Sequence, residues 1–264
     1  MIVEFIGCDG AGKTTLSRLL SEQRIAEYRA VAMPDLLLDR VGLRRITHRT
    51  AVNVVQDVGG FPFFLHSIRR HRDWVAFAAR MLDRHAGSTV DKLNGMRGIV
   101  RRVGMYELAR SRASSRIVLS DEGTVLSAYY YALSDVAFDP FELERFARLV
   151  PRPDLIVYVK APAATLVQRA LSRPVTRRQH AGKERSEVER TIRRTADVFD
   201  LVAATQPLRD RVIVVQNDDG DPVRGERLME EISGRLQAWV AAGVVADGPS
   251  FQHRPDQLRP EPRP

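Results

Sequence analysis

Residues 7–14 read GCDGAGKT, and this stretch decides the fold. It matches the pattern G-x-x-x-x-G-K-[ST], which is typical of a phosphate-binding loop. A short apolar run, residues 2–6, precedes it and predicts a buried strand that only Glu4 interrupts. Residues 15–20 follow with leucines at helical spacing. A strand, a glycine loop and a helix in this order are the context that supports nucleotide binding by the motif.

Each position of the loop has an expected task. Gly10 and Gly12 let the backbone take positive φ angles and turn its N–H groups toward phosphate oxygens. We expect Lys13 to reach the β- and γ-phosphates and the Thr14 hydroxyl to hold Mg²⁺. The predicted nucleotide-binding residues are Gly7, Asp9, Gly10, Ala11, Gly12, Lys13, Thr14 and Thr15. The loop therefore predicts ATP and Mg²⁺ as cofactors, against the alternative of a plain glycine turn at a helix start.

Composition limits the classes of partner. The chain has 264 residues and is 44% hydrophobic, which is enough for a sizeable core. The formal net charge is +8, and the excess is arginine. Such a balance suits an anionic substrate or nucleic acid, and a drift toward arginine explains it equally well. Because no basic block is interleaved with aromatic residues, we favour a small molecule over nucleic acid.

The use of cysteine indicates a compartment. Cys8 is the only cysteine, so the chain has no internal disulfide, as expected in a reducing cytoplasm. Its place inside the loop favours a role as a small filler. Glu4 interrupts the first apolar run, so we see no signal peptide. No apolar stretch approaches membrane-spanning length, and the prediction is a cytoplasmic protein without a membrane partner.

Strands and helices alternate along the chain. Strands are predicted at residues 2–6, 29–33, 116–120, 154–160 and 211–216. Helices are predicted at residues 14–28, 66–85, 94–109, 141–149, 164–171, 187–204 and 224–242. Gly42, Gly59, Gly60 and Pro62 are interpreted as breaks. The alternation predicts an α/β fold with right-handed crossovers and a parallel sheet covered on both faces. Residues 1–242 form one predicted domain, and the proline-rich residues 243–264 a disordered tail.

Three segments carry a family resemblance: FIGCDGAGKTTL, VLSDEGTVLSAYYY and PDLIVYVKAPAATLVQRALSR. On these segments the chain resembles the thymidylate kinase and deoxynucleoside kinase group of P-loop kinases. The resemblance implies the three-layer P-loop NTPase fold of the kinase type, with a five-stranded parallel sheet. It also implies a helical insertion at residues 36–91 near the acceptor site and a lid at residues 172–186.

The chain departs from that group at two motifs. The group's Arg-Glu-Pro after the second strand is here Ala32-Met33-Pro34-Asp35, and its Asp-Arg pair is here Asp121-Glu122. In the resembled group, the residues that contact the acceptor come mostly from these parts. The sequence therefore leaves three classes of acceptor: a nucleoside, a nucleoside monophosphate or a similar metabolite. It also leaves ATP and GTP as alternative phosphate donors.

Two aspartates and three lid arginines are the catalytic candidates. Asp121 ends the third predicted strand, where it would serve the metal or accept a proton; a helix cap is the alternative. Asp35 could act as the base, or it is a turn aspartate. By resemblance, the lid arginines would stabilise charge on the transferred phosphoryl group, with Arg173 also on the nucleotide. These arginines are Arg173, Arg177 and Arg178, and a solvated loop is the alternative.

Three further arginines are candidates for the acceptor. Arg97, Arg101 and Arg102 lie on the predicted helix before the third strand, roughly where the resembled group places an arginine for the acceptor phosphate. We expect one of them to face the cleft and the others to be solvated.

These observations favour one function over two others. The leading hypothesis is an ATP- and Mg²⁺-dependent small-molecule kinase, with a homodimer as a candidate assembly. The first alternative is a P-loop ATPase or GTPase switch that acts on a protein partner, although no Asn-Lys-x-Asp guanine-reading sequence is present. The second is a nucleic-acid end kinase, which the net charge of +8 encourages.

Overall fold

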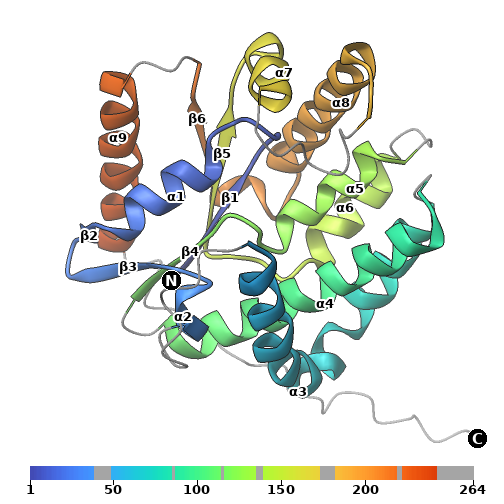
Figure 1. Ribbon diagram of the computed structural model, residues 1–264. Coiled ribbons are helices and arrows are strands. Elements are labelled where there is room, and N and C mark those ends of the chain that lie inside the picture. The colour runs from blue at the N-terminus through green and yellow to red at the C-terminus, as the bar shows by residue number, and fades with distance from the viewer. Residues whose placement is uncertain are drawn as a thin grey trace, which may run out of the picture.

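A single sheet runs through the middle of the molecule (Figure 1). The structure is a computed structural model that describes residues 1–38, 49–84, 87–113, 116–134, 139–172, 182–218 and 222–242. Its strands are β1 (Ile2–Ile6), β2 (Arg24–Ile25), β3 (Tyr28–Ala32), β4 (Arg116–Ser120), β5 (Leu155–Lys160) and β6 (Val212–Gln216). They lie in the order β2-β3-β4-β1-β5-β6.

The five strands predicted from the sequence are the five that pair in parallel. β1 lies between β4 and β5, β3 pairs with β4, and β6 pairs with β5. The prediction of a parallel α/β sheet is therefore confirmed. The sixth strand, β2, is two residues long and adds an antiparallel edge to β3.

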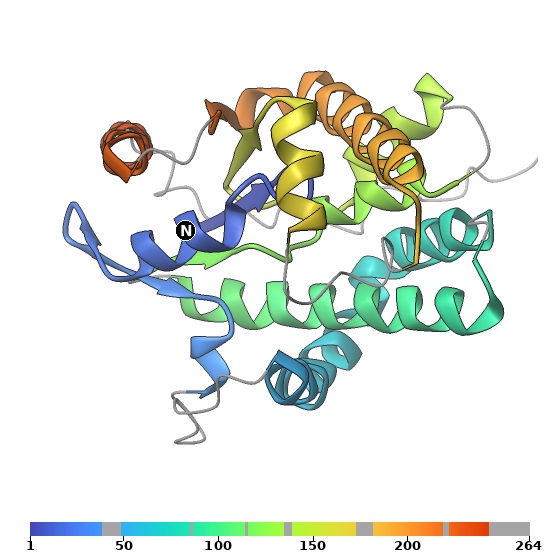
Figure 2. The same cartoon turned by 45° about the horizontal axis from the view of Figure 1, so that its top comes forward.

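Helices cover both faces of the sheet, which makes three layers (Figure 2). They are α1 (Lys13–Ser21), α2 (Asp35–Leu38), α3 (Arg49–Asp83), α4 (Thr89–Arg112), α5 (Tyr129–Ala132), α6 (Pro140–Leu149), α7 (Ala163–Leu171), α8 (Arg185–Ala204) and α9 (Pro222–Ala241), with 3₁₀ turns η2 (Val125–Ala128) and η3 (Arg209–Arg211). One apolar cluster joins the sheet to α1, α7 and α9, and a second joins it to α4, α5 and α6. α8 contributes to both clusters.

Helix α1 is shorter than the sequence predicted. We expected a helix to residue 28, but α1 ends at Ser21 and the chain turns into the β2–β3 hairpin. The hairpin pairs Ile25 with Tyr28, and Ala26 takes a left-handed φ of 52° in the turn. Burial of Ile25 in the core offsets the unusual backbone there, and this tertiary contact is what local helical spacing does not reveal.

The expected breaks at Gly59, Gly60 and Pro62 are wrong, because α3 runs through all three. The glycines serve the crossing of α3 and α4. A Cβ atom on Gly104 would lie 2.2 Å from the carbonyl oxygen of Gly60. Only glycine allows the two backbones to come this close, so residues that read as helix breakers are here contact points between helices.

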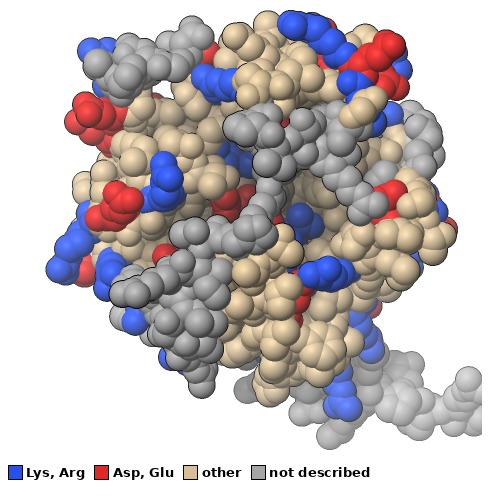
Figure 3. All heavy atoms as spheres, in the orientation of Figure 1, with Lys and Arg blue, Asp and Glu red and all other residues tan. Residues whose placement is uncertain are grey.

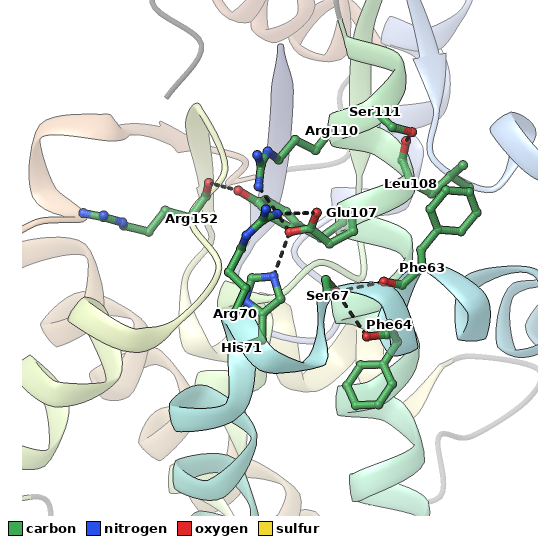
Figure 4. A network of polar contacts seen from close by, with 11 residues as sticks. Phe63, Phe64, Ser67, Arg70, His71, Glu107, Leu108, Arg110, Ser111 and Arg152 are labelled. Carbon is green, nitrogen blue, oxygen red and sulfur yellow. Dashed lines mark hydrogen bonds and ion pairs between the residues drawn. The ribbon is translucent and has the colours of Figure 1, made fainter. Parts of the chain in front are cut away.

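Helix α3 changes direction along its length (Figure 1). Pro62 has no N–H to donate within the helix, which is a common cause of bending. About one turn later, the Ser67 hydroxyl donates to the Phe63 carbonyl oxygen at 2.8 Å and lies 3.2 Å from that of Phe64 (Figure 4). Such back-bonding also bends helices. The two features together let α3 cross α4 near Gly60 and then follow it.

A charged network fixes the later part of α3 against α4 (Figure 4). His71 Nε2 lies 2.7 Å from Glu107 Oε1, and Arg70 and Arg110 donate to the same carboxylate at 3.2 and 3.4 Å. Burial alone would raise the pKa of Glu107, but His71 and the two arginines outweigh it and hold that pKa below its usual value. The carboxylate therefore stays ionised and ties the two helices together.

Candidate nucleotide and acceptor site

The phosphate loop lies between the end of β1 and the start of α1, as the sequence predicted. Gly7, Gly10 and Gly12 take φ angles of 133°, 86° and 94°. A Cβ atom on Gly7 would lie 2.3 Å from the Val159 carbonyl oxygen, so both the backbone angle and the space require glycine there. The loop conformation turns N–H groups into a concavity that fits an anion.

Lys13 folds back across the loop. Its Nζ donates to the carbonyl oxygens of Gly7 and Cys8, both at 2.7 Å, and the residue is buried. These bonds hold the ammonium group over the place where the loop would receive phosphates. Phosphate oxygens are stronger acceptors for this cation than carbonyl groups, so a nucleotide would take over the lysine.

Thr14 and Asp121 come together at the mouth of the loop. The Thr14 hydroxyl donates to Asp121 Oδ2 at 2.7 Å. The contact follows from the sheet order, because β1 and β4 are neighbours in parallel and Glu4 is paired with Ser120 in register. Hydroxyl and carboxylate oxygens are the hard donors that Mg²⁺ prefers, with phosphate and water completing its coordination. The two residues therefore fit a Mg²⁺ ion at this point.

Other loop residues are packed rather than reactive. Cys8 is 3% exposed, its Sγ donates to the Ile192 carbonyl at 3.6 Å, and burial raises the pKa of its thiol to about 12. This agrees with the expected filler role. Asp9 and Ala11 are buried beside it, whereas Thr15 is exposed.

Two side chains that the sequence did not assign to the loop donate hydrogen bonds to its carbonyl oxygens. Asn217, which follows β6, donates from Nδ2 to the Ala11 carbonyl at 2.7 Å. Arg169 on α7 donates to the carbonyls of Gly10 at 3.2 Å and of Asn217 at 3.3 Å. Neither side chain carries a motif, so only the assembled sheet brings them to the loop.

The three acceptor candidates on α4 have different surroundings. Arg97 donates from Nε to Asp57 Oδ2 at 2.7 Å. Arg101 lies 3.3 Å from Glu122 and 3.7 Å from Asp57, and its side chain is 13% exposed. Arg97 is therefore paired with a carboxylate of α3, and Arg101 with carboxylates of α3 and of the turn after β4. The sequence predicted that one of the three arginines faces the cleft and that the others are solvated. The Arg97 side chain is 56% exposed, whereas Arg101 is largely buried.

Arg102 is buried among polar and aromatic groups instead. Its Nη1 donates to the Ser127 hydroxyl at 3.4 Å, and its guanidinium lies 5.9 Å from the ring centres of Tyr129 and Tyr130. Among the described residues, no carboxylate forms an ion pair with it. Glu4 and Glu122 act on this cation electrostatically without forming an ion pair with it. A buried cation that has no directly bonded carboxylate suits an anionic partner.

The remaining candidates lie apart or outside the described residues. Asp35 begins α2 and lines a surface groove with Arg18, Arg24 and Arg29, beside α1 and the hairpin. Arg173, Arg177 and Arg178, and most of the predicted lid, lie outside the residues that the structure describes.

The face seen in Figure 3 is hollowed near its centre. Blue Lys or Arg atoms and red Asp or Glu atoms form part of the floor of this hollow. In the described ranges, no cluster of three or more His, Cys, Asp or Glu side chains could hold a metal ion by itself. A Mg²⁺ ion here would thus depend on the nucleotide for much of its coordination.

None of the helices in the described part of the chain has the length and apolar character needed to cross a membrane.

Comparisons with known proteins find likeness in fold only. No family model and no curated protein matches the sequence. Shikimate kinase from Bacteroides thetaiotaomicron is similar at 13% identity and a TM-score of 0.46, covering 90% of this chain and 98% of that one. Thymidylate kinase from Candida albicans is similar at 12% identity and a TM-score of 0.45, covering 92% of each chain. Deoxyadenosine kinase from M. mycoides, with dCMP and dCDP bound, is similar at 14% identity and a TM-score of 0.48; the match covers 90% of this chain and 100% of that chain.

With TM-scores below 0.5, these likenesses say nothing about the reaction. The strand order of the described residues, by itself, shows the three-layer P-loop architecture. The loop lies at the carboxyl end of the central strand β1. Any inference about the reaction therefore rests on the residues around that loop.

Proposed function

We propose that the protein is a kinase that transfers the γ-phosphate of ATP to a small-molecule acceptor. The contact between Thr14 and Asp121 beside Lys13 is the observation that carries this proposal. The loop N–H groups and Lys13 would bind the phosphates, and Thr14 and Asp121 would hold Mg²⁺. A Mg²⁺ ion bound there offsets negative charge on the β- and γ-phosphate oxygens.

The acceptor carries an anionic group in this proposal. Arg102 supports it, since this buried cation donates to the Ser127 hydroxyl and forms no ion pair with a carboxylate of the described residues. Arg97 and Arg101 already have carboxylate partners and would frame the site. A nucleoside monophosphate or a similar phosphorylated or carboxylated metabolite fits this arrangement better than a neutral nucleoside.

The other roles rest on placement along the chain. Asp121 would accept the proton of the attacking hydroxyl, or Asp35 would do so if its segment moves toward the loop. Arg173, Arg177 and Arg178 would close over the phosphates and stabilise the charge that spreads over the transferred group.

An acceptor screen tests the proposal. ADP formation from Mg·ATP is measured with nucleosides, nucleoside monophosphates, sugars and hydroxy acids, each with and without a phosphate group. We expect strong stimulation by one small class and a preference for its anionic member. Stimulation only by protein fractions or only by DNA or RNA ends would replace the proposal with a switch ATPase or an end kinase.

Lys13→Ala is the matched inactive control for this screen. Removing the ammonium group deletes the point charge on the β- and γ-phosphates, so turnover should fall by about 10²-fold or more, while the thermal midpoint stays near that of the wild type. Near wild-type turnover in a folded Lys13→Ala protein would contradict transfer at this loop.

A further inference from the structure

Glu4 is a carboxylate in the middle of the central strand. Along β1, Val3 and Phe5 face the cluster under α1, α7 and α9, whereas Ile2 and Ile6 face the opposite side. Glu4 lies between these two isoleucines and is 1% exposed. The sequence marked it only as an interruption of the apolar run. A charged group at such a position requires specific partners, because burial without them is strongly unfavourable.

Among the described residues, the hydrogen-bond partners of Glu4 come from the turn that follows β4. Glu4 Oε1 accepts a hydrogen bond from the Leu126 backbone N–H at 2.7 Å, and Oε2 lies 3.4 Å from the Thr124 hydroxyl. The Val125 N–H also faces this carboxylate. Arg102 of α4 also acts on it electrostatically. The carboxylate thus lies against the turn formed by residues 123–126.

Gly123 shows how closely this turn fits. A Cβ atom on Gly123 would lie 2.3 Å from Glu4 Cδ and 2.4 Å from Oε2. Because a β-carbon cannot be accommodated there, only glycine lets the turn rest directly on the carboxylate. The φ angle of Gly123 is not in the left-handed region, so the close approach alone explains the glycine.

The hydrogen-bond donors around Glu4 show which hydrogen-bonding groups its side chain must provide. The Thr124 hydroxyl also lies 2.5 Å from the Pro151 carbonyl oxygen, and its single hydrogen cannot serve both acceptors. When Thr124 donates to Pro151, a protonated Glu4 can donate to Thr124 while its other oxygen keeps the Leu126 N–H. The position therefore needs an acceptor and tolerates a donor, which is the hydrogen-bonding character of a glutamine side chain.

The turn that Glu4 holds carries two residues of the site. Asp121 accepts from Thr14 at 2.7 Å, and Glu122 pairs with Arg101 at 3.3 Å. We propose that Glu4 is a positioning residue, which fixes the turn after β4 so that the Asp121 carboxylate lies beside Thr14 at the loop. This inference rests on the proposed function, since it assigns Glu4 to the placement of the Mg²⁺-binding oxygens.

Two substitutions at Glu4 separate positioning from packing. Glu4→Met keeps a similar volume but removes the acceptor, whereas Glu4→Gln keeps an acceptor and a donor. Ile6→Val on the same strand and face is the control for a small loss of packing. The probe is a fluorescent ATP analogue, and its dissociation constant is measured with Mg²⁺ and with EDTA.

The quantity of interest is the gain in affinity that Mg²⁺ produces. Glu4→Met should lose about 10-fold or more of this gain, as is typical when support behind metal ligands is removed. Its affinity in EDTA should stay near that of the wild type. Glu4→Gln and Ile6→Val should keep the gain to within a few-fold. A full Mg²⁺ gain in folded Glu4→Met would overturn the proposal, and so would equal losses in the Met and Gln variants.

A second measurement needs no nucleotide. Hydrogen exchange of peptides that cover residues 121–128 should be faster in Glu4→Met than in wild type and Glu4→Gln, because the Leu126 N–H loses its acceptor. If the wild type binds no nucleotide, the proposed function fails while this comparison still decides the role of Glu4. Should Glu4→Met not fold, Gly123→Ala displaces the same carboxylate and should show the same faster exchange; unchanged exchange would overturn the proposal.

Discussion

At the residue scale, the placement of Asp121 makes a sharp prediction about metal dependence. Asp121→Asn keeps an oxygen for the Thr14 hydroxyl but removes the negative charge beside it. The Mg²⁺ concentration for half-maximal ATP turnover should rise by about 10- to 100-fold, because a carboxylate ligand is replaced by a weaker neutral one. A Mg²⁺ titration of the turnover rate measures this change.

Asp139→Asn is the matched control, since its side chain caps α6 by accepting from the Phe141 N–H at 2.9 Å. It should leave the Mg²⁺ titration unchanged. If Asp121→Asn also leaves that titration unchanged and only lowers the thermal midpoint, Asp121 is a structural residue and not a metal ligand.

The Cys8 thiol should not react with alkylating reagents in the folded protein. Its thiol is 3% exposed, and burial raises its pKa to about 12, so it stays protonated across the working range of pH. Raising the pH from 7 to 9, which ionises an ordinary thiol of pKa about 8.5, should therefore not speed alkylation. Intact mass after iodoacetamide treatment measures the labelling. Complete labelling at pH 9 without urea would contradict this burial.

At the element scale, the crossing of α3 and α4 depends on Gly104. Gly104→Ala would place a methyl group 2.2 Å from the Gly60 carbonyl oxygen, and neither backbone can yield easily. We expect a loss of about 2–3 kcal/mol in the free energy of unfolding, as for overpacked sites. Urea unfolding measures the change.

Gly234→Ala in α9 is the matched control for helix propensity. Nothing lies within 4 Å of a Cβ atom at this position. The substitution should stabilise the protein by about 0.5–1 kcal/mol. If both variants shift stability equally, the close approach of α3 and α4 does not restrict residue 104.

These glycines also show where a single sequence stops being informative. Gly59, Gly60 and Pro62 have low helix propensity, and local rules predict a break. Packing against α4 overrides that tendency, and the partner, Gly104, is far away in the chain. The β2–β3 hairpin was missed for the same reason, because Ile25 is buried by residues outside its own segment. The five parallel strands were predictable, since each is a short apolar run between turn signals.

The residues of the candidate site also fall into those that local sequence predicts and those that depend on distant neighbours. The loop residues and Asp121 could be placed from the sequence, because the motif and the end of a strand are local signals. The supporting groups could not, since Arg169, Asn217 and Glu4 gain their meaning only from neighbours on other strands and helices. Glu4 did leave one signal, which is a charge inside an apolar strand.

At the scale of the whole molecule, Glu4 should make stability depend on pH. Burial raises the pKa of Glu4 from 4.5 to about 7 in the folded protein, so the folded state binds its proton more tightly than the unfolded state does. Its contribution is fully present below pH 4.5 and is lost as the pH rises through 7. Up to about 3 kcal/mol of unfolding free energy is involved.

The comparison of wild type with Glu4→Gln isolates this contribution. Urea unfolding at several pH values between 5 and 8 should show the wild type losing stability relative to the glutamine variant as the pH rises. Parallel pH curves for the two proteins would mean that Glu4 titrates alike in the folded and unfolded states.

The sheet order has a consequence for how the chain matures during synthesis. The central strand β1 precedes both of its neighbours in the chain, which are residues 116–120 and 155–160. A growing chain therefore carries its phosphate loop without the neighbouring strands until residue 160 has been made, and the apolar strand β1 is not yet paired on both sides. Ligand capture should begin only after residue 160 has left the ribosome, so a nascent chain arrested earlier should remain insensitive to ATP.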